Sequence, residues 1–182
     1  IKASESENYG RIINQKQFLR LKNLLSQGEI IFGGNYNEQN NYISPTLIKP
    51  YELNNTLMEE EIFGPILPIL EFKNIESVIE YINQRPRPLA LYYFGTKNAN
   101  IIKQTISGGA CINDAIMHII PHNLPFGGIG QSGMGAYHGK KSFDTFSHYK
   151  SVLKTHKNFE FKIKYPPYTS LKQKIIRLFM DR

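Results

Sequence analysis

Apolar residues recur at helical spacing in the stretch that follows Asn14. The residues that would share one face of this helix are Phe18, Leu21, Leu24 and Leu25. Asn14 belongs to the residue types that cap helix N-termini, and Gly28 to those that end helices. A short apolar run at residues 29–32 then predicts a strand, which Gly-Gly-Asn at 33–35 interrupts.

The same alternation continues as far as Asn113. Apolar or extended runs predict strands at residues 42–48, 66–72 and 89–94, and a further strand that leads from Gly108-Gly109 to about Asn113. Asn74 and Asn98 are placed to cap two helices, the first stopped before Pro86 and the second running through Ile106. Strands that alternate with helices predict an α/β fold with a parallel sheet flanked by helices.

The last third of the chain has a different pattern. Residues 121–139 are crowded with Gly and Pro, which predicts a long functional loop, and residues 140–146 predict a short helix. Residues 147–156 predict an extended strand. After a rigid Tyr-Pro-Pro-Tyr break at 165–168, an amphipathic helix is expected, with an apolar face of Leu171, Ile175, Leu178 and Phe179 opposite Lys172, Lys174 and Arg177.

The composition is that of a globular protein. The chain has 182 residues, of which 41% are hydrophobic and 20% charged, and no run of about 18 apolar residues predicts a membrane span. The single cysteine, Cys111, excludes an internal disulfide. The formal net charge of +7 would suit an anionic partner, but the basic residues are spread thinly outside residues 154–182, so we expect no nucleic-acid binding. Because the first residue is Ile1, we expect a processed chain or a piece of a longer one.

Several short blocks resemble the motifs of one enzyme family. Residues 61–65 read E-I-F-G-P, and residues 124–128 read L-P-F-G-G. Further blocks are N-Q-R at 83–85, P-L-A-L-Y at 88–92, S-G-G at 107–109, S-G-M-G at 132–135, Y-H-G-K at 137–140 and S-F-D-T-F-S-H at 142–148. In this order and spacing they resemble the aldehyde dehydrogenases, in the class 3 branch that includes the fatty aldehyde dehydrogenases. The resemblance extends from residue 9 to residue 167.

The resemblance implies a division of the chain and a reaction. Residues 1–146 would be the C-terminal part of the catalytic domain, 147–158 an oligomerisation strand, and 159–182 a tail with an amphipathic helix. In the family a cysteine thiolate attacks the aldehyde, hydride passes to NAD or NADP, and a carboxylate activates water to hydrolyse the thioester. In relatives the nucleophilic Cys and the base Glu lie upstream of the matching segment. We therefore expect no catalytic residue here and no turnover by this chain alone.

Four residues match positions that have a binding role in the family. Glu61 would accept hydrogen bonds from both hydroxyls of the nicotinamide ribose, and Phe63 would pack against the nicotinamide ring. Phe126 would line the aldehyde tunnel, and Asn113 would lie near the same pocket and fix its backbone. Without the resemblance, Glu61 is an exposed acid, Phe63 a core residue and Asn113 a strand-end turn residue.

Other patterns that could carry chemistry have simpler explanations. Cys111 lies in an apolar strand with no nearby His or helix N-terminus, so we expect an inert buried thiol. His118 and His122 are four residues apart, but Pro121 argues against a helix that presents both to a metal, and we expect no metal. Residues 128–133 match G-x-G-x-x-G without the first strand that a dinucleotide fingerprint follows.

The resemblance also implies how the whole protein works. It would oxidise medium- or long-chain aldehydes in the cytoplasm as a homodimer. The tail has two interpretations: its basic amphipathic pattern predicts peripheral contact with the endoplasmic reticulum or another intracellular membrane, and the resemblance implies a helix that covers the substrate entrance. Two alternatives stay open: a short paralogue that acts as a non-catalytic assembly or peripheral membrane-binding module, and a binder of nucleic acid or membrane surface whose affinity depends steeply on salt.

Overall fold

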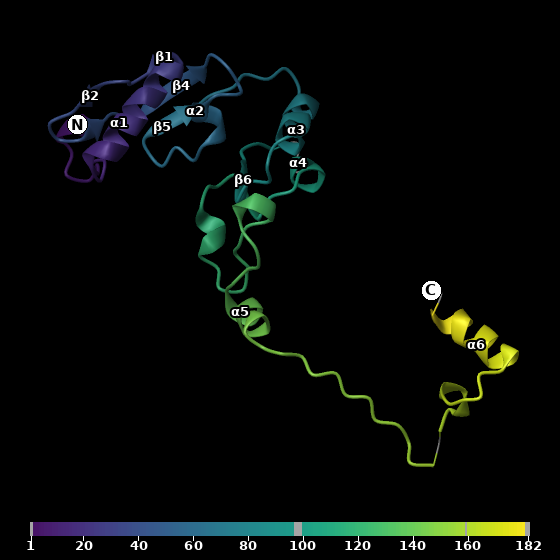
Figure 1. Cartoon of the computed structure of the whole chain (residues 1–182). Helices are drawn as coiled ribbons and strands as arrows, with labels where there is room; N and C mark the ends of the chain where they lie inside the picture. The colour runs from purple at the N-terminus through teal and green to yellow at the C-terminus, as the bar shows by residue number, and fades with distance from the viewer. Residues whose placement is uncertain (1, 97–99, 159, 181–182) are drawn as a thin grey trace. The chain divides into compact units, whose positions relative to one another are not determined.

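The computed structural model describes residues 2–96, 100–158 and 160–180. The chain forms two compact units. Figure 1 colours the chain by residue number, from purple at the N-terminus to yellow at the C-terminus. The first unit comprises Ile1–Arg87 and Thr96–Ile106, and the second comprises Pro88–Gly95 and Ser107–Arg182. Helices and strands with parallel pairings occur in both units, so the predicted α/β class is confirmed.

Helix α1 (Gln15–Leu24) forms the centre of the first unit, and the 3-10 turn η2 (Leu25–Gln27) extends it. Asn14 caps α1 as predicted, because its side chain accepts a hydrogen bond from the Gln17 N–H at 2.9 Å. The predicted apolar face is buried in a core made of Phe18, Leu21, Leu24, Leu25, Ile43, Ile48, Leu57 and Ile66. Burying an apolar side chain of this size contributes about 1.5–3 kcal/mol, so this cluster is the main stabilising feature of the unit.

Two small sheets pack with this helix. Their strands are β1 (Gly28–Phe32), β2 (Tyr36–Asn37), β3 (Tyr42–Ile43), β4 (Thr46–Pro50) and β5 (Ile66–Pro68). The larger sheet has the order β1-β4-β5, and the smaller pairs β2 with β3. The predicted parallel pairing occurs between β4 and β5, whereas β1 is antiparallel to β4 because the chain returns without a crossover helix. The strand predicted at 66–72 ends early, at Pro68.

The remaining regular elements of the first unit are helical. They are the 3-10 turn η1 (Ala3–Glu5) and the helices α2 (Thr56–Glu59), α3 (Ile75–Asn83) and α4 (Asn100–Gln104). Asn74 caps α3 as predicted, because its side chain accepts a hydrogen bond from Ser77 N–H at 2.9 Å. Asn55 caps the short α2 in the same way, bonding to Met58 N–H at 3.2 Å. The cap predicted at Asn98 lies outside the described residues.

The second unit contains one parallel strand pair and a long irregular region. Its elements are β6 (Ala90–Tyr93), β7 (Gly109–Ile112), the 3-10 turns η3 (Met117–Ile119), η4 (Gly130–Ser132) and η5 (Lys162–Lys164), and the helices α5 (Gly139–Thr145) and α6 (Ser170–Met180). β6 and β7 pair in parallel, as predicted. The run at 89–94 is apolar, yet its side chains are exposed or half-buried in this chain.

Residues 147–156 form no strand within this single chain. Strand hydrogen bonds need a neighbouring strand, and the described residues offer none to this segment. Its predicted pairing with a second subunit therefore stays a prediction. No helix in the described ranges has the length and apolar character needed to cross a bilayer.

Candidate functional site

The loop that follows α2 carries the two residues predicted to contact a dinucleotide. Both Glu61 and Phe63 are exposed, and Phe63 keeps 84% of its surface accessible. Phe63 also has φ +46°, in the left-handed region that non-glycine residues seldom adopt. The alternative that Phe63 is a core residue is therefore wrong. The backbone turns the ring outward instead of into the core.

This loop is fixed to the core on both sides of Phe63. Arg20 on α1 donates a hydrogen bond to the Ile62 carbonyl at 2.6 Å. On the other side, the Thr46 N–H of β4 donates to the Pro65 carbonyl at 2.9 Å. An exposed residue with strained backbone persists only when its surroundings hold it, and these contacts supply that support.

Phe63 borders a hollow of about 480 Å³. The other residues that line it are Arg11, Ile12, Ile13 and Gln17. Glu61 has neither a hydrogen-bond nor an ion-pair partner within the described part of the chain. A carboxylate with unused lone pairs and an exposed aromatic ring two residues away fit the ribose hydroxyls and the ring of a nicotinamide nucleotide.

Phe126 lies at the centre of an aromatic and histidine cluster in the second unit. It forms an isolated antiparallel bridge with Tyr137, whose two backbone hydrogen bonds are 3.0 and 2.9 Å long. Its ring centroid is 5.4 Å from that of His118, 5.7 Å from that of Tyr137 and 6.4 Å from that of His138. Sequence reasoning noted residues 137–140 as a family block but missed the role of Tyr137 and His138 beside Phe126. Tyr137 and His138 lie 11 and 12 residues after Phe126, and the folding of the loop between them brings these side chains together.

Asn113 closes the end of the β6–β7 pair. It has φ +57°, its N–H donates to the Tyr93 carbonyl at 2.7 Å, and its Oδ1 accepts from Gly95 N–H at 2.8 Å. Asn tolerates this backbone region better than most residues. The side chain thus fixes the backbone where the two strands end, and its predicted place beside an aldehyde pocket stays a prediction.

Cys111 corrects one expectation from the sequence. Its thiol is buried as predicted, but Sγ lies 3.3 Å from Nδ1 of His118. The expectation that no His lies nearby is therefore wrong. The turn η3 folds back so that the His118 ring covers Gly109, where an added Cβ would lie 2.6 Å from the ring. The His122 ring instead lies against the ring of His138, so His118 and His122 contact different side chains.

No group of three or more His, Cys, Asp or Glu side chains arranged to hold a metal occurs among the described residues. The clearest charge cluster of the second unit is on α5 and the residues after it. Lys140 donates to Asp144 at 2.8 and 2.7 Å, and Tyr149 donates to the same carboxylate. The Lys140 hydrogen bond, followed by that of Tyr149, lowers the pKa of Asp144, and Asp144 raises the pKa of both partners. Lys140 and Tyr149 are exposed and Asp144 is half-buried, so the cluster orders the end of α5 without a large effect on stability.

The four predicted residues thus fall into two pairs. Glu61 and Phe63 share one loop of the first unit, whereas Asn113 and Phe126 belong to the second. Each pair is positioned by backbone contacts of its own unit.

The α/β fold and the exposed carboxylate and aromatic ring of the 61–65 loop fit an enzyme domain that binds a dinucleotide. The model of the aldehyde dehydrogenase family matches residues 2–152, and the chain belongs to this family. Aldehyde dehydrogenase family 3 member B1 of Bos taurus is 45% identical over 181 residues, which are 97% of this chain and 39% of that protein. The dimeric NADP-preferring aldehyde dehydrogenase of Rattus norvegicus is 48% identical over 171 residues, 91% of this chain and 38% of that protein.

Solved structures agree with this assignment. The substrate-bound AldH of Staphylococcus aureus has a TM-score of 0.78 and 46% identity, and the match covers 97% of this chain and 40% of that one. The Mycobacterium tuberculosis aldehyde dehydrogenase in complex with NAD+ has a TM-score of 0.70 and 28% identity, covering 80% and 32%. The chain therefore spans about two fifths of the relatives that it matches, and the resemblance to class 3 aldehyde dehydrogenases is confirmed.

Proposed function

We propose that this chain supplies the nicotinamide-side loop and part of the aldehyde pocket of an NAD(P)+-dependent aldehyde dehydrogenase. The complete enzyme oxidises medium- or long-chain aldehydes to carboxylic acids through a cysteine thioester. The observation that supports this most directly is the 61–65 loop, where the outward Phe63 lines a hollow and Glu61 has no side-chain partner among the described residues. Family membership supplies the reaction class.

The chemistry divides between this chain and residues that it does not contain. The nucleophilic Cys and the base Glu belong to the part of the relatives that this chain does not match. We do not assign the nucleophile's role to Cys111, because its thiol is buried in the β6–β7 strand pair, although His118 lies beside it. We therefore expect no aldehyde oxidation by this chain alone.

The cofactor contacts follow from the groups on the loop. The Glu61 carboxylate accepts hydrogen bonds from the two hydroxyls of the nicotinamide ribose, and Phe63 holds the ring in place. The dinucleotide, when bound, accepts the hydride that leaves the aldehyde. Both NAD and NADP are compatible with these contacts. One relative is described as NADP-preferring, and another was solved with NAD+.

The experiment that tests this proposal compares Glu61→Gln with Glu59→Gln in the complete enzyme. Gln keeps the size of Glu but loses a charged acceptor, so E61Q should raise the Kd for the dinucleotide about tenfold. E59Q makes the same change two residues earlier, at the end of α2, and should stay within about twofold of wild type. Equal Kd values for E61Q and wild type by fluorescence titration would refute the cofactor role.

We propose that Phe126 contacts the aldehyde chain and that Asn113 keeps the nearby strand ends in register. Phe126 offers an apolar ring beside His118 and His138, which would suit an aldehyde with a polar head and an apolar tail. Phe126→Ala should therefore raise KM more for a long aldehyde than for acetaldehyde. A uniform change in KM across chain lengths would contradict this role.

Assembly and membrane contact are further parts of the proposal. Residues 147–158 expose apolar side chains, among them Tyr149, Val152 and Leu153, which a second subunit would cover to form a homodimer. The enzyme would be cytoplasmic. Helix α6 carries apolar and basic side chains, which suit peripheral contact with an anionic intracellular membrane such as that of the endoplasmic reticulum. Unchanged vesicle binding after deletion of residues 170–182 would contradict membrane contact.

The same exposed segment favours a second candidate function. A polypeptide of this length could act as a non-catalytic assembly module that pairs through residues 147–158 with full-length subunits. The intact mass of the native polypeptide distinguishes the complete enzyme from the short assembly module. A mass near 21.0 kDa would favour the module, and a much larger mass would favour the complete enzyme.

A further inference from the structure

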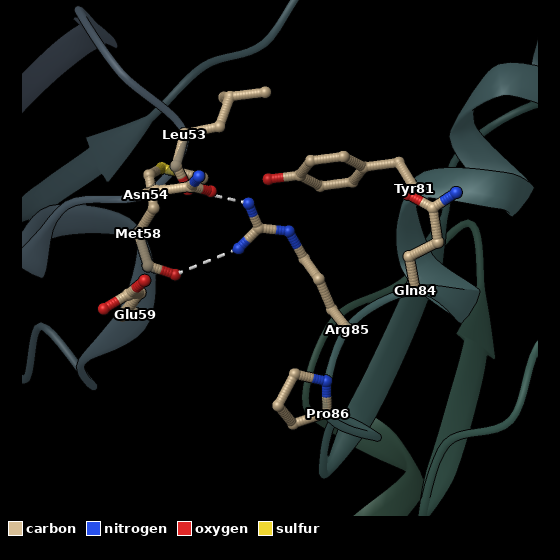
Figure 2. Close-up of a pocket in the computed structure, with 8 residues that line it drawn as sticks. All are labelled: Leu53, Asn54, Met58, Glu59, Tyr81, Gln84, Arg85 and Pro86. Atoms are coloured by element: carbon tan, nitrogen blue, oxygen red, sulfur yellow. Dashed lines mark hydrogen bonds between the residues drawn. The ribbon is translucent and has the colours of Figure 1, made fainter.

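Two arginines of the first unit contact backbone carbonyls around the loop that carries Glu61 and Phe63. Arg85 follows the C-cap of α3, and Figure 2 shows its guanidinium reaching across a hollow to the segment that includes α2. Nη2 of Arg85 donates to the Leu53 carbonyl at 2.8 Å, and Nη1 approaches the Met58 carbonyl at 3.5 Å. These carbonyls lie on either side of the start of α2, so the Arg85 side chain contacts both the segment before the helix and the helix itself.

The position of Arg85 is itself fixed. Its guanidinium carbon lies 4.3 Å from the centre of the Tyr81 ring, within the range of a cation–π contact. Both side chains line a hollow of about 710 Å³, with Leu53, Asn54, Met58 and Glu59 on the opposite side (Figure 2). Arg85 is half-buried and has no ion-pair partner within the described ranges. Its charge therefore acts on carbonyl groups instead of a carboxylate.

Helix α2 needs such support because it is short. It has four residues, and a helix of one turn is not stable by itself in water. Leu57 anchors it in the core, and the Gln27 side chain accepts a hydrogen bond from Leu57 N–H at 2.8 Å. Arg85 adds a tie at Met58, three residues before Glu61.

Arg20 acts at the other side of Glu61. Its Nη2 donates to the Ile62 carbonyl at 2.6 Å, and its Nε donates to the Gln17 side chain at 2.8 Å, which fixes the guanidinium plane. The Ile62 carbonyl belongs to the peptide unit that leads into Phe63, the residue with φ +46°. A charge-assisted hydrogen bond to this carbonyl restrains the rotation that would let Phe63 leave the left-handed region.

We propose that Arg20 and Arg85 are positioning residues that set the orientation of Glu61 and Phe63 toward the dinucleotide. The inference rests on the proposed function, because it assigns the two arginines to the same cofactor loop. Neither arginine contacts the cofactor in this role. Lysine would not replace either, since the planar fork of arginine reaches two acceptors in fixed directions and an ammonium group is a single point charge.

The test compares Arg20→Gln and Arg85→Gln with Arg87→Gln in the complete enzyme. Arg87 is exposed and lies two residues after Arg85, so its variant loses the same charge outside the loop contacts. R20Q and R85Q should each raise the dinucleotide Kd about tenfold, because loss of the charged hydrogen-bond donor lets Glu61 and Phe63 leave the orientation that binds the dinucleotide. Arg20→Lys and Arg85→Lys should recover only part of this loss, and R87Q should stay within about twofold of wild type.

Two further measurements separate positioning from general destabilisation. Hydrolysis of an activated ester needs a nucleophilic thiol but no dinucleotide, so R20Q and R85Q should keep it within about twofold. Backbone amide exchange at residues 60–64 should accelerate in both variants and stay unchanged in R87Q. Loss of ester hydrolysis together with cofactor binding would show a structural role only and would overturn the inference.

The outcomes also separate this inference from the function on which it rests. If E61Q leaves the dinucleotide Kd unchanged, the proposed function of the loop fails first. If E61Q weakens binding while R20Q and R85Q bind like wild type, the loop has its function but the two arginines do not position it.

Discussion

Gly64 illustrates how closely single residues determine the candidate site. A Cβ built at this position would lie 2.6 and 2.7 Å from the two δ-carbons of Leu21, inside van der Waals contact. Leu21 is completely buried in the main core and cannot give way freely. The glycine therefore lets the 61–65 loop approach the core directly after Phe63.

Replacing Gly64 by Ala should destabilise the chain by about 1–3 kcal/mol, because an added methyl group overpacks the core at Leu21. Denaturant unfolding measures the change. Gly10→Ala is the matched control, since a Cβ at Gly10 would meet no atom within 4 Å. A G64A midpoint equal to that of G10A would show that the loop moves away without cost.

Asp144 gives a prediction about pH. Its pKa is lowered in the folded state by hydrogen bonds from Lys140 first and Tyr149 second. The contribution of this contact is therefore present above the unfolded-state pKa of about 3.9 and is lost as pH falls through the lower folded-state pKa. In Lys140→Met, the Asp144 carboxyl should titrate at higher pH, as followed by its NMR chemical shift. An unchanged titration midpoint would mean that the Lys140 contact does not persist in solution.

Some residue contacts could not be predicted from the sequence. The approach of His118 to Cys111 depends on η3 and on Ile116 at φ +69°, a backbone state that an isoleucine gives no reason to expect. Glu61 and Phe63 could be named from the family block, but the outward turn of Phe63 could not. The contacts of Arg20 and Arg85 join positions 42 and 27 residues apart, and spacing along the chain gives no sign of them.

At the scale of elements, local signals predicted helices better than strands. Asn14 and Asn74 cap helices at the expected places, because an N-cap depends only on the next few residues. Strand ends depend on partners, and the predicted strand at 66–72 shortened to Ile66–Pro68. The antiparallel pairing of β1 with β4 could not be predicted either, because the pattern of apolar residues along a strand does not give the direction of its partner.

Removing the cap of α1 should lower the stability of the whole first unit, because α1 carries the largest part of its core. Asn14→Ala should cost about 1 kcal/mol, the usual contribution of an N-cap side chain. Thermal unfolding of the variant beside Asn40→Ala, a change at an exposed turn residue, measures the effect. A smaller loss for N14A than for N40A would show that α1 begins elsewhere in solution.

At the scale of the molecule, the chain buries few of its large apolar residues. Exposed ones include Ile31 and Phe32 of β1, Phe143 and Phe146 at α5, and Leu153 with 90% of its surface accessible. Globular proteins seldom leave so many large apolar groups in water unless another surface covers them. This agrees with a chain that matches about two fifths of its relatives' length.

The chain by itself should therefore self-associate, because its exposed apolar groups lower their free energy by covering one another. Sedimentation velocity across a range of concentrations should show a rising average mass, with binding of the dye ANS at the lowest concentration. The net charge of +7 opposes association, so added salt should strengthen it by screening the repulsion. A concentration-independent monomer without ANS binding would contradict the exposed surface described above.

The backbone of Phe63 bears on how stability and activity are related in this protein. A non-glycine residue at φ +46° costs the folded state about 1–2 kcal/mol, and a ring that remains 84% exposed recovers little of this by burial. Glycine would adopt the same backbone without strain. Selection for folding alone would thus favour a small residue at this position, and directed evolution scored only on thermal tolerance should remove the ring. If Phe63 holds the nicotinamide ring as proposed, the more heat-resistant protein would be the poorer enzyme, a trade-off confined to one side chain.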